Sequence, residues 1–349
     1  ERCRDQEFPR RVRPRRCAGE ANRLRQQCAG CGERRLITMD NGSEKAMHRD
    51  CIITAAYGVG PDYVRTFLRT FRAVNTSARI ILMVNHLRPL QAIAAENKAE
   101  QHLNKWLCRV MPVVALKHKR QRLKLTELIS RTNDLMPRLG RVLPEAWIEL
   151  FSSVIVGRHF HARRILRQNT FRQVLLCDCR DVLFQADPFA SPGPFEVAEE
   201  DRMIGRCPYN TKWLKRGLGD AIAADLAEHH AVCAGTILGP HEDVLSHLDR
   251  LISMVGKARS WRPFGLDQAI HNYLVHRVLR FTDYVVSSNE RGRIATVSAD
   301  ADYRFCDGYV VDASGAPFPI VHQYDRLAAQ VYRNLKVLAE RQNEPVPGF

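Results

Sequence analysis

The sequence predicts an α/β protein built on a mixed, mainly parallel β-sheet that is flanked by helices. Short apolar runs typical of buried strands recur from residue 51 onward, and amphipathic helical segments separate them. The chain has 349 residues, 45% of them apolar, which is enough for a sizeable core. Its charged fraction of 26% is that of a globular protein, so disorder of the bulk of the chain and a fibrous fold are excluded.

The first part of the sheet is predicted from three short apolar runs. Residues 51–56 and 79–84 have the composition of buried strands, and a third strand is predicted over residues 110–116. A glycine-bearing turn at residues 57–60 leads into a helix over residues 61–74, because proline suits a first helical turn and apolar side chains recur on one face. Strands that alternate with helices favour parallel pairing.

The second part of the chain continues this alternation. Apolar runs rich in Val, Leu and Ile predict the strands, the spacing of apolar residues predicts the helices, and the Pro-Gly-Pro run at residues 192–194 ends the first of these units. In chain order, the predicted elements are a helix over residues 144–169, a strand over 174–177 that continues through 183–184 and 188–189, a strand over 232–238, helices over 242–255 and 267–278, a hairpin strand at 310–311 and a last strand over 319–322.

Three regions are expected along the chain. Residues 1–48 form a basic extension, because they hold eleven arginines before Leu36 and almost no periodic apolar pattern. Residues 49–325 form the α/β domain, and residues 326–349 form an amphipathic C-terminal helix and tail. No internal repeat is evident.

The extension also contains four cysteines, Cys3, Cys17, Cys28 and Cys31, which with His48 could ligate Zn²⁺. The spacing of the outer pair is irregular for a zinc knuckle. The simpler interpretation is a solvated basic segment that touches anionic lipid or polymer.

The formal net charge of +15 favours anionic partners. Nucleic acid is not expected, because the extension lacks interleaved aromatic residues and no groove-reading motif is evident. Peripheral contact with an anionic membrane is expected instead. No run of about 18 uncharged apolar residues exists, so no membrane span is predicted. Cysteines in apolar runs favour a reducing compartment and hence the cytoplasm. For a eukaryotic protein, the expected location is instead the Golgi lumen.

The strongest local signal for chemistry is a pair of acids at the end of the strand over residues 174–177. Asp178 and Asp181 emerge where ligands bind in open α/β sheets. Carboxylates there can hold a hard divalent ion, which bridges a diphosphate and neutralises its charge. The alternative is a solvated turn in which Arg180 pairs with one acid.

Several segments, taken in order, resemble a known family. They are Cys51 to Gly60, the acid segment Asp178 to Phe189, Cys233-Ala-Gly-Thr236, Gly265-Leu-Asp-Gln268 followed by Asn272, and Pro319 to Tyr324. Over residues 50–325 they resemble the GT-A glycosyltransferases, in particular retaining members such as glycogenin and bacterial lipooligosaccharide galactosyltransferases. The resemblance implies a Rossmann-like GT-A fold. It also implies transfer of a sugar, with retention of anomeric configuration, from a nucleotide-diphosphate sugar to a glycan, lipid or protein acceptor.

The resemblance also implies roles for individual residues. Asp178, Asp181 and His322 are the expected metal ligands. Asp267 and Gln268 are the expected catalytic residues beside the donor sugar. The expected donor-binding residues are Tyr57, Gly58, Asp178, Arg180, Gly235 and Thr236.

The acid pair departs from the family pattern. The family places acids at positions i and i+2, whereas here position i+2 is Arg180 and the second acid, Asp181, is at i+3. Residues i and i+3 of a strand face opposite sides, so the acids converge only if the chain turns directly after Cys177. Two alternatives therefore remain for neutralising the diphosphate: a metal ion held by the acids, or the charge of Arg180.

Each remaining residue also has a purely structural interpretation. His322 is either a ligand, which would favour Mn²⁺ over the oxygen-preferring Mg²⁺, or a hydrogen-bonded structural histidine. Asp267 is either a sugar ligand or a helix N-cap. Tyr57 either stacks on a nucleobase or caps the core. Arg158 and His159 precede the acid strand, where solvated helix surface is favoured over contact with a diphosphate.

Other functions remain as alternatives. A polyanion- or nucleic-acid-binding protein would use the basic extension, and a catalytically inactive GT-A fold would explain the altered acid spacing. A sugar nucleotidyltransferase needs a loop rich in glycine and lysine after the first strand, which residues 57–62 do not supply. The turn at residues 57–60 also lacks the dinucleotide and P-loop fingerprints.

Overall fold

The structure is a computed structural model that describes residues 49–104, 145–261, 264–279, 284–297, 301–327 and 333. The basic extension, the strand predicted at residues 110–116 and nearly all of the C-terminal helix predicted over residues 326–341 lie outside this part of the chain.

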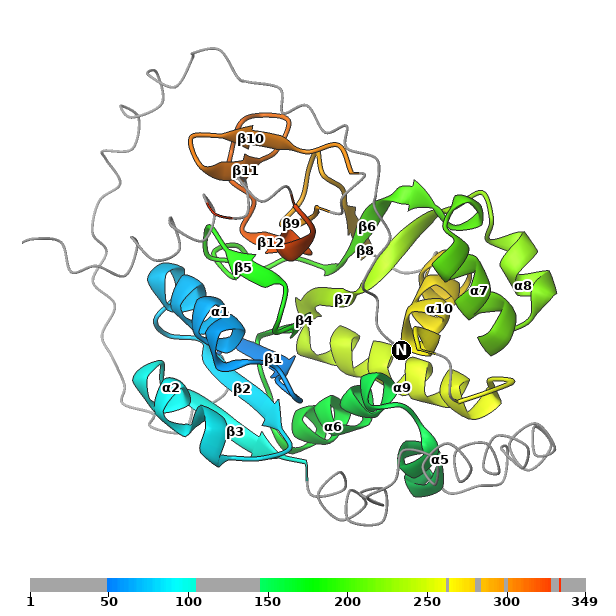
Figure 1. The fold of residues 1–349 in the computed structure, drawn as a ribbon, viewed down its shortest axis with the longest axis horizontal. Coiled ribbons are helices and arrows are strands. Elements are labelled where there is room, and N and C mark those ends of the chain that lie inside the picture. Colours follow the sequence, from blue (N-terminus) through cyan, green and yellow to red (C-terminus); the bar gives the residue numbers. More distant parts are fainter. Residues whose placement is uncertain are drawn as a thin grey trace, which may run out of the picture.

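The molecule is built on a seven-stranded mixed sheet with the strand order β3-β2-β1-β4-β7-β6-β8 (Figure 1). Four neighbouring pairs are parallel, and β7 runs antiparallel to both of its neighbours. The predicted α/β class with a mainly parallel sheet is confirmed. The strands are β1 (Cys51–Ala55), β2 (Arg79–Val84), β3 (Ala99–Leu103), β4 (Gln173–Asp178), β6 (Phe195–Met203), β7 (His230–Pro240) and β8 (Tyr284–Ser287).

Helices cover both faces of this sheet because alternate strand residues point to opposite sides. Ile52 and Ile80 belong to the apolar cluster of α1 and α2, whereas Ile53 and Ile81 belong to that of α6 and α9. Figure 1 shows α1 on one side of the strands and α6 and α9 on the other. The helices are α1 (Pro61–Val74), α2 (Gln91–Glu96), α5 (Glu145–Phe151), α6 (Val154–Gln168), α7 (Pro208–Gly217), α8 (Asp220–Asp225), α9 (His241–Lys257) and α10 (Leu266–Tyr273).

A smaller three-stranded sheet, β5-β12-β9, lies beside the main one. Its strands are β5 (Val182–Phe184), β9 (Ile294–Thr296) and β12 (Ile320–His322). A hairpin of β10 (Arg304–Cys306) and β11 (Tyr309–Val311) forms a third sheet, as predicted for residues 310–311.

The helical region predicted over residues 144–169 is confirmed and consists of two helices, because the Ser153 side chain accepts a hydrogen bond from the Val156 amide and starts α6 anew. One predicted strand was wrong in extent. The strand expected to continue from β4 does not continue. The chain bends over residues 179–181, and β5 pairs with β12 in the smaller sheet instead.

The polar strands were missed. β3 lies at the edge of the sheet and carries Glu100, Gln101 and His102, so it lacks the apolar run that marks a buried strand. β6 contains four consecutive charged residues after Ala198 and follows the Pro-Gly-Pro run. Neighbouring strands determine these two elements more than their own composition does.

Part of β7 takes its hydrogen bonds from a helix. β4 pairs with β7 only from Thr236 onward, so the preceding residues of β7 have no partner on that side. Side-chain amides of α10 replace the missing strand. The Val232 amide donates to Asn272 Oδ1 (2.8 Å), and Asn272 Nδ2 and Gln268 Nε2 both donate to the Val232 carbonyl (2.9 Å each). The Ala234 amide donates to Gln268 Oε1 (2.8 Å).

We expect Asn272→Ala to lower the free energy of unfolding by about 2–3 kcal/mol, because it leaves the buried Val232 amide without an acceptor. Urea denaturation measures this loss. Asn97→Ala is the matched control, since the Asn97 side chain makes a single bond, to the Ile93 carbonyl, and should cost about 1 kcal/mol. Equal losses in the two variants would contradict a strand-replacing role for α10.

Candidate metal and ligand site

The candidate site lies where the order of the strands reverses. From β1 the chain proceeds outward to β2 and β3, and it then returns to β4 on the other side of β1. β1 and β4 are parallel, and Ala55 pairs with Asp178, so their carboxyl ends lie side by side. In open α/β sheets such a reversal opens a crevice in which ligands bind. Asp178 is therefore at the position where a ligand is expected.

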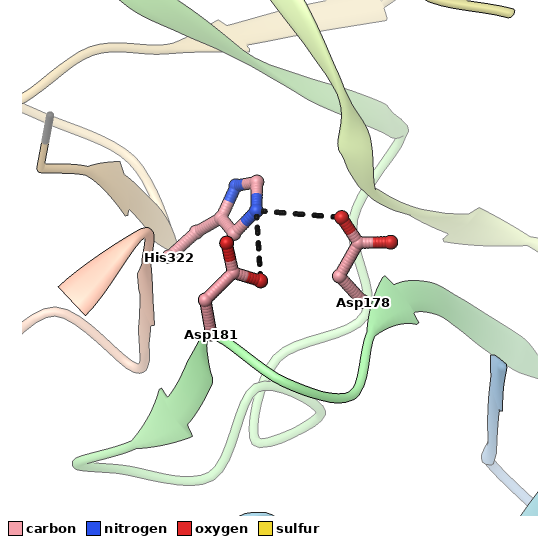
Figure 2. A group of neighbouring side chains, drawn as sticks. All are labelled: Asp178, Asp181 and His322. Carbon is pink, nitrogen blue, oxygen red and sulfur yellow. Dashed lines mark ion pairs between the residues drawn. The ribbon is translucent and has the colours of Figure 1, made fainter. Parts of the chain in front are cut away.

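Asp178, Asp181 and His322 gather at this point (Figure 2). His322 Nε2 lies 3.7 Å from an oxygen of Asp181 and 3.9 Å from an oxygen of Asp178. The bend at residues 179–181 turns Asp181 back, and the register of β5 with β12 sets His322 opposite Val182. The Gln323 amide also donates to the Asp181 carbonyl (2.7 Å). The predicted convergence of these three side chains is confirmed.

The electrostatics of this group favour a cation. Burial, together with repulsion from Asp178 and Asp325, raises the pKa of Asp181 to about 7. Burial lowers the pKa of His322 to about 4, although Asp178 opposes that shift, so the imidazole is neutral at pH 7 and has a lone pair to share. A bound cation would offset the repulsion between the two acids.

Gly235 of β7 completes a cradle for an ion. A Cβ atom at this residue would overlap His322 Cε1 and would lie 2.7 Å from His322 Nε2 and 2.8 Å from Asp178 Oδ2. The missing side chain therefore leaves room between the donor atoms themselves. With two carboxylates and one neutral imidazole whose ligand atoms lie within 4.8 Å of one another, the residues fit a divalent metal ion.

Arg158 links the acid group to Asp267. Its guanidinium forms an ion pair with Asp178 on one side and lies 3.2 Å from Asp267 on the other. His159 Nε2 is 3.3 Å from the same Asp267 oxygen. The expectation that Arg158 and His159 are solvated helix surface was wrong, because their side chains are 17% and 5% exposed. α6 turns them toward the sheet.

Asp267 is an ionised carboxylate held in a buried position, 2% exposed. Burial alone would raise its pKa. The hydrogen bond from His159 and the charge of Arg158 outweigh burial and hold the pKa of Asp267 at about 2. A negative charge is therefore present beside the acid–histidine group throughout the physiological range.

These groups open onto one cleft of about 640 Å³, a size typical of small-molecule sites. Five of the residues predicted from sequence line it, namely Asp178, Gly235, Asp267, Gln268 and His322. They come from β4, β7, α10 and β12, which are far apart in the sequence.

Tyr57 and Gly58 do not line the cleft. The Tyr57 hydroxyl is 2.7 Å from His161 Nδ1 and accepts a hydrogen bond from Asn104 Nδ2 (3.3 Å). Gly58 has a positive φ of 69°, and a Cβ there would meet nothing within 4 Å. The glycine is thus favoured by the shape of the turn and not by a close approach.

Three further predicted residues lie outside the cleft lining. Asp181 lies in the bend just before β5, with a carboxylate oxygen near His322 Nε2. The side chain of Arg180 is 62% exposed, pairs with Asp325 at 3.4 Å and lies over the Tyr63 ring. Thr236 is fully buried within β7. Arg180 therefore pairs with Asp325 and not with Asp178 or Asp181, and it is not among the residues that line the cleft.

Gln268 lines the cleft, but both ends of its amide are bonded to the backbone of β7. It holds the strand that carries Gly235. Other cleft residues were missed from the sequence, among them Arg202, Arg326 and three aromatic side chains described below. The one signal for them was the position of Phe264 directly before the Gly265–Gln268 segment.

We expect Gly235→Ala to abolish Mn²⁺ binding while the fold is retained, because the added methyl group would occupy the space between His322 and Asp178. Isothermal titration calorimetry measures binding, and circular dichroism measures the fold. Gly157→Ala in α6 is the matched control, since a Cβ there meets nothing within 4 Å. Unchanged Mn²⁺ affinity in Gly235→Ala would show that the ion does not bind in this cradle.

Mn²⁺ affinity should also depend on pH. Asp181 must lose its proton to act as a ligand, so the affinity should be nearly constant above about pH 8 and should fall about tenfold per pH unit below pH 7. Calorimetry in buffers of different ionisation enthalpy should detect about one proton released per ion at pH 6 and almost none at pH 8. A constant affinity from pH 6 to pH 8 would exclude Asp181 as a titrating ligand.

Comparisons with known proteins identify no family for this chain. No protein-family model matches it, and no curated protein matches it in sequence. Among the described residues, no helix combines the length and the apolar character needed to cross a bilayer. The functional conclusion therefore depends on the site itself.

Proposed function

We propose that this chain is a GT-A glycosyltransferase that transfers a sugar from a nucleotide-diphosphate donor to an acceptor with metal assistance and retention of configuration. The observation that carries the proposal is the single cleft that Asp178, His322, Gly235 and Asp267 line together. The segments that resemble the family in sequence supply these residues from four separate elements. Their proximity is what a common donor site requires.

One end of the cleft suits the diphosphate of the donor. A divalent ion held by Asp178, Asp181 and His322 would neutralise the charge that develops on the departing diphosphate. The imidazole ligand favours Mn²⁺ over Mg²⁺ in this role. Arg158 supplies a permanent positive charge at the same end of the cleft. In this proposal it takes the place that the sequence suggested for Arg180, whose side chain points elsewhere.

The next part of the cleft suits the donor sugar. Asp267 is ionised and can accept hydrogen bonds from sugar hydroxyls, and its charge can stabilise an oxocarbenium-like transition state. Gly235 lets the strand backbone approach the sugar closely. The catalytic role of Gln268 remains a prediction. Its bonds to β7 support a positioning role for the side chain.

The nucleotide would extend from the cleft toward the carboxyl end of β1. Tyr57 and Gly58 lie in the turn just after β1, whose last residue, Ala55, pairs with Asp178. In this proposal Tyr57 and Gly58 contact the nucleobase, and the backbone of Thr236 contacts the donor.

Two other functions are alternatives to this proposal. A catalytically inactive relative would bind the nucleotide sugar without turning it over. A polyanion-binding protein would act through residues 1–48, which lie outside the described part of the chain.

Thermal-shift measurements against UDP-, GDP- and CMP-sugars, with and without Mn²⁺, test the proposal. One donor should raise the melting temperature only when Mn²⁺ is present, because a ligand stabilises the state that binds it. Asp267→Asn keeps the size of the side chain and removes its charge. We expect it to lower turnover at least tenfold with nearly normal donor affinity, the pattern of a lost transition-state interaction.

No stabilisation by any nucleotide sugar would exclude a glycosyltransferase. Binding without turnover or hydrolysis in the unmodified chain would identify the inactive alternative. A product whose glycosidic bond is inverted by NMR would contradict retention but not the GT-A assignment.

A further inference from the structure

One wall of the cleft is aromatic. Tyr209 and Trp213 are four residues apart on α7 and therefore share a face of that helix. Their ring centroids are 6.0 Å apart, and Phe264 lies 6.1 Å from Trp213. All three side chains line the same cleft as Asp178 and Asp267. We call these three residues the aromatic wall.

The aromatic wall is unusually exposed. In the part of the chain that the structure describes, five large apolar side chains are exposed, and two of them are Tyr209 at 50% and Phe264 at 68%. The other three are aliphatic and lie outside the cleft. Apolar side chains gathered at one opening mark a ligand or partner site more often than scattered ones do.

The central ring of the wall, Trp213, is held in place by packing. Trp213 packs against an apolar cluster that includes Leu214 and Ala269. Gly265 has a positive φ of 82°, and a Cβ there would overlap the indole ring, so the backbone of this residue lies against Trp213. A preformed surface loses little conformational entropy when a ligand binds.

Contacts connect the wall to the donor site. Gly265 contacts Trp213 and directly precedes the first residue of α10. The second residue of α10 is Asp267, which pairs with Arg158 beside Asp178. Figure 1 shows α7 and α10 together, away from β1, and the two helices are in contact. A ligand on the wall would therefore lie on the far side of Asp267 when viewed from the acid–histidine group.

We infer that the aromatic wall binds the acceptor and that the acceptor is a glycan. This inference rests on the proposed function. A pyranose ring has an apolar C–H face, which matches the electron-rich face of an aromatic ring, and polar hydroxyls around its edge. Glu200, Arg202 and Arg326 line the same cleft and offer charged partners for such hydroxyls. A lipid chain would gain nothing from these charges, and it would have to desolvate them.

The test compares Phe264→Ala and Tyr209→Ala with the unmodified full-length chain on a glycan array. We expect the unmodified chain to bind a defined set of glycans, and each variant to bind them at least tenfold more weakly. Phe264→Tyr should retain binding because it keeps the ring. Val285→Ala on β8 is the control for loss of an exposed apolar side chain, and it should bind normally. Both rings are exposed, so melting temperatures should stay within a few degrees.

UDP with Mn²⁺, measured by calorimetry, separates the acceptor from the donor. Its affinity should be unchanged in Phe264→Ala and Tyr209→Ala. A loss of UDP affinity would assign the wall to the nucleobase, and binding to phospholipid vesicles in place of glycans would assign it to a lipid. Absence of glycan binding, or binding that the variants leave unchanged, would also overturn the inference. Glycan binding that depends on the wall, in a chain that no nucleotide sugar stabilises, would instead overturn the proposed function.

Discussion

A single buried guanidinium joins the two acidic parts of the cleft. Arg158 contacts Asp178, which ends β4, and Asp267, which begins α10. Burial would raise the pKa of Asp267, and the charge of Arg158 together with the hydrogen bond from His159 offsets that effect and keeps the carboxylate ionised against the sheet. Removing one partner of a buried ion pair commonly costs about 3–5 kcal/mol. The relative position of the acid–histidine group and Asp267 therefore depends on one side chain of α6.

Much of the fold could be predicted from the sequence where local pattern and tertiary role agree. α1 begins at Pro61 and ends at Val74 as its apolar spacing predicts, and β2 matches its apolar run. The convergence of Asp178, Asp181 and His322 could also be predicted. The resemblance ordered the segments, and the acid spacing required the bend that the chain makes after β4.

The rest depends on neighbours that no local pattern encodes. The burial of Arg158 follows from the way α6 packs, whereas composition alone predicts that an arginine on a helix is exposed to solvent. The bonds from Gln268 to β7 exist only because β4 is shorter than β7. The aromatic wall was missed because α7 follows β6, a charged strand without a regular apolar pattern. Sequence reasoning thus identified the charged side chains of the cleft better than the apolar surfaces around them.

The half of β7 that is bonded to a helix has a consequence for how the cleft responds to its ligands. The segment of β7 before Gly235 pairs with β6 on one side, but on the side that faces away from β6 it is bonded to α10 and not to a strand. The cleft floor can therefore loosen or tighten together with α10 while β1, β2 and β4 stay as they are. A ligand held by Asp267 would steady that helix and, through Gln268 and Asn272, the strand segment beside the acid–histidine group. Occupancy at Asp267 would in this way increase the order of the neighbouring part of the cleft.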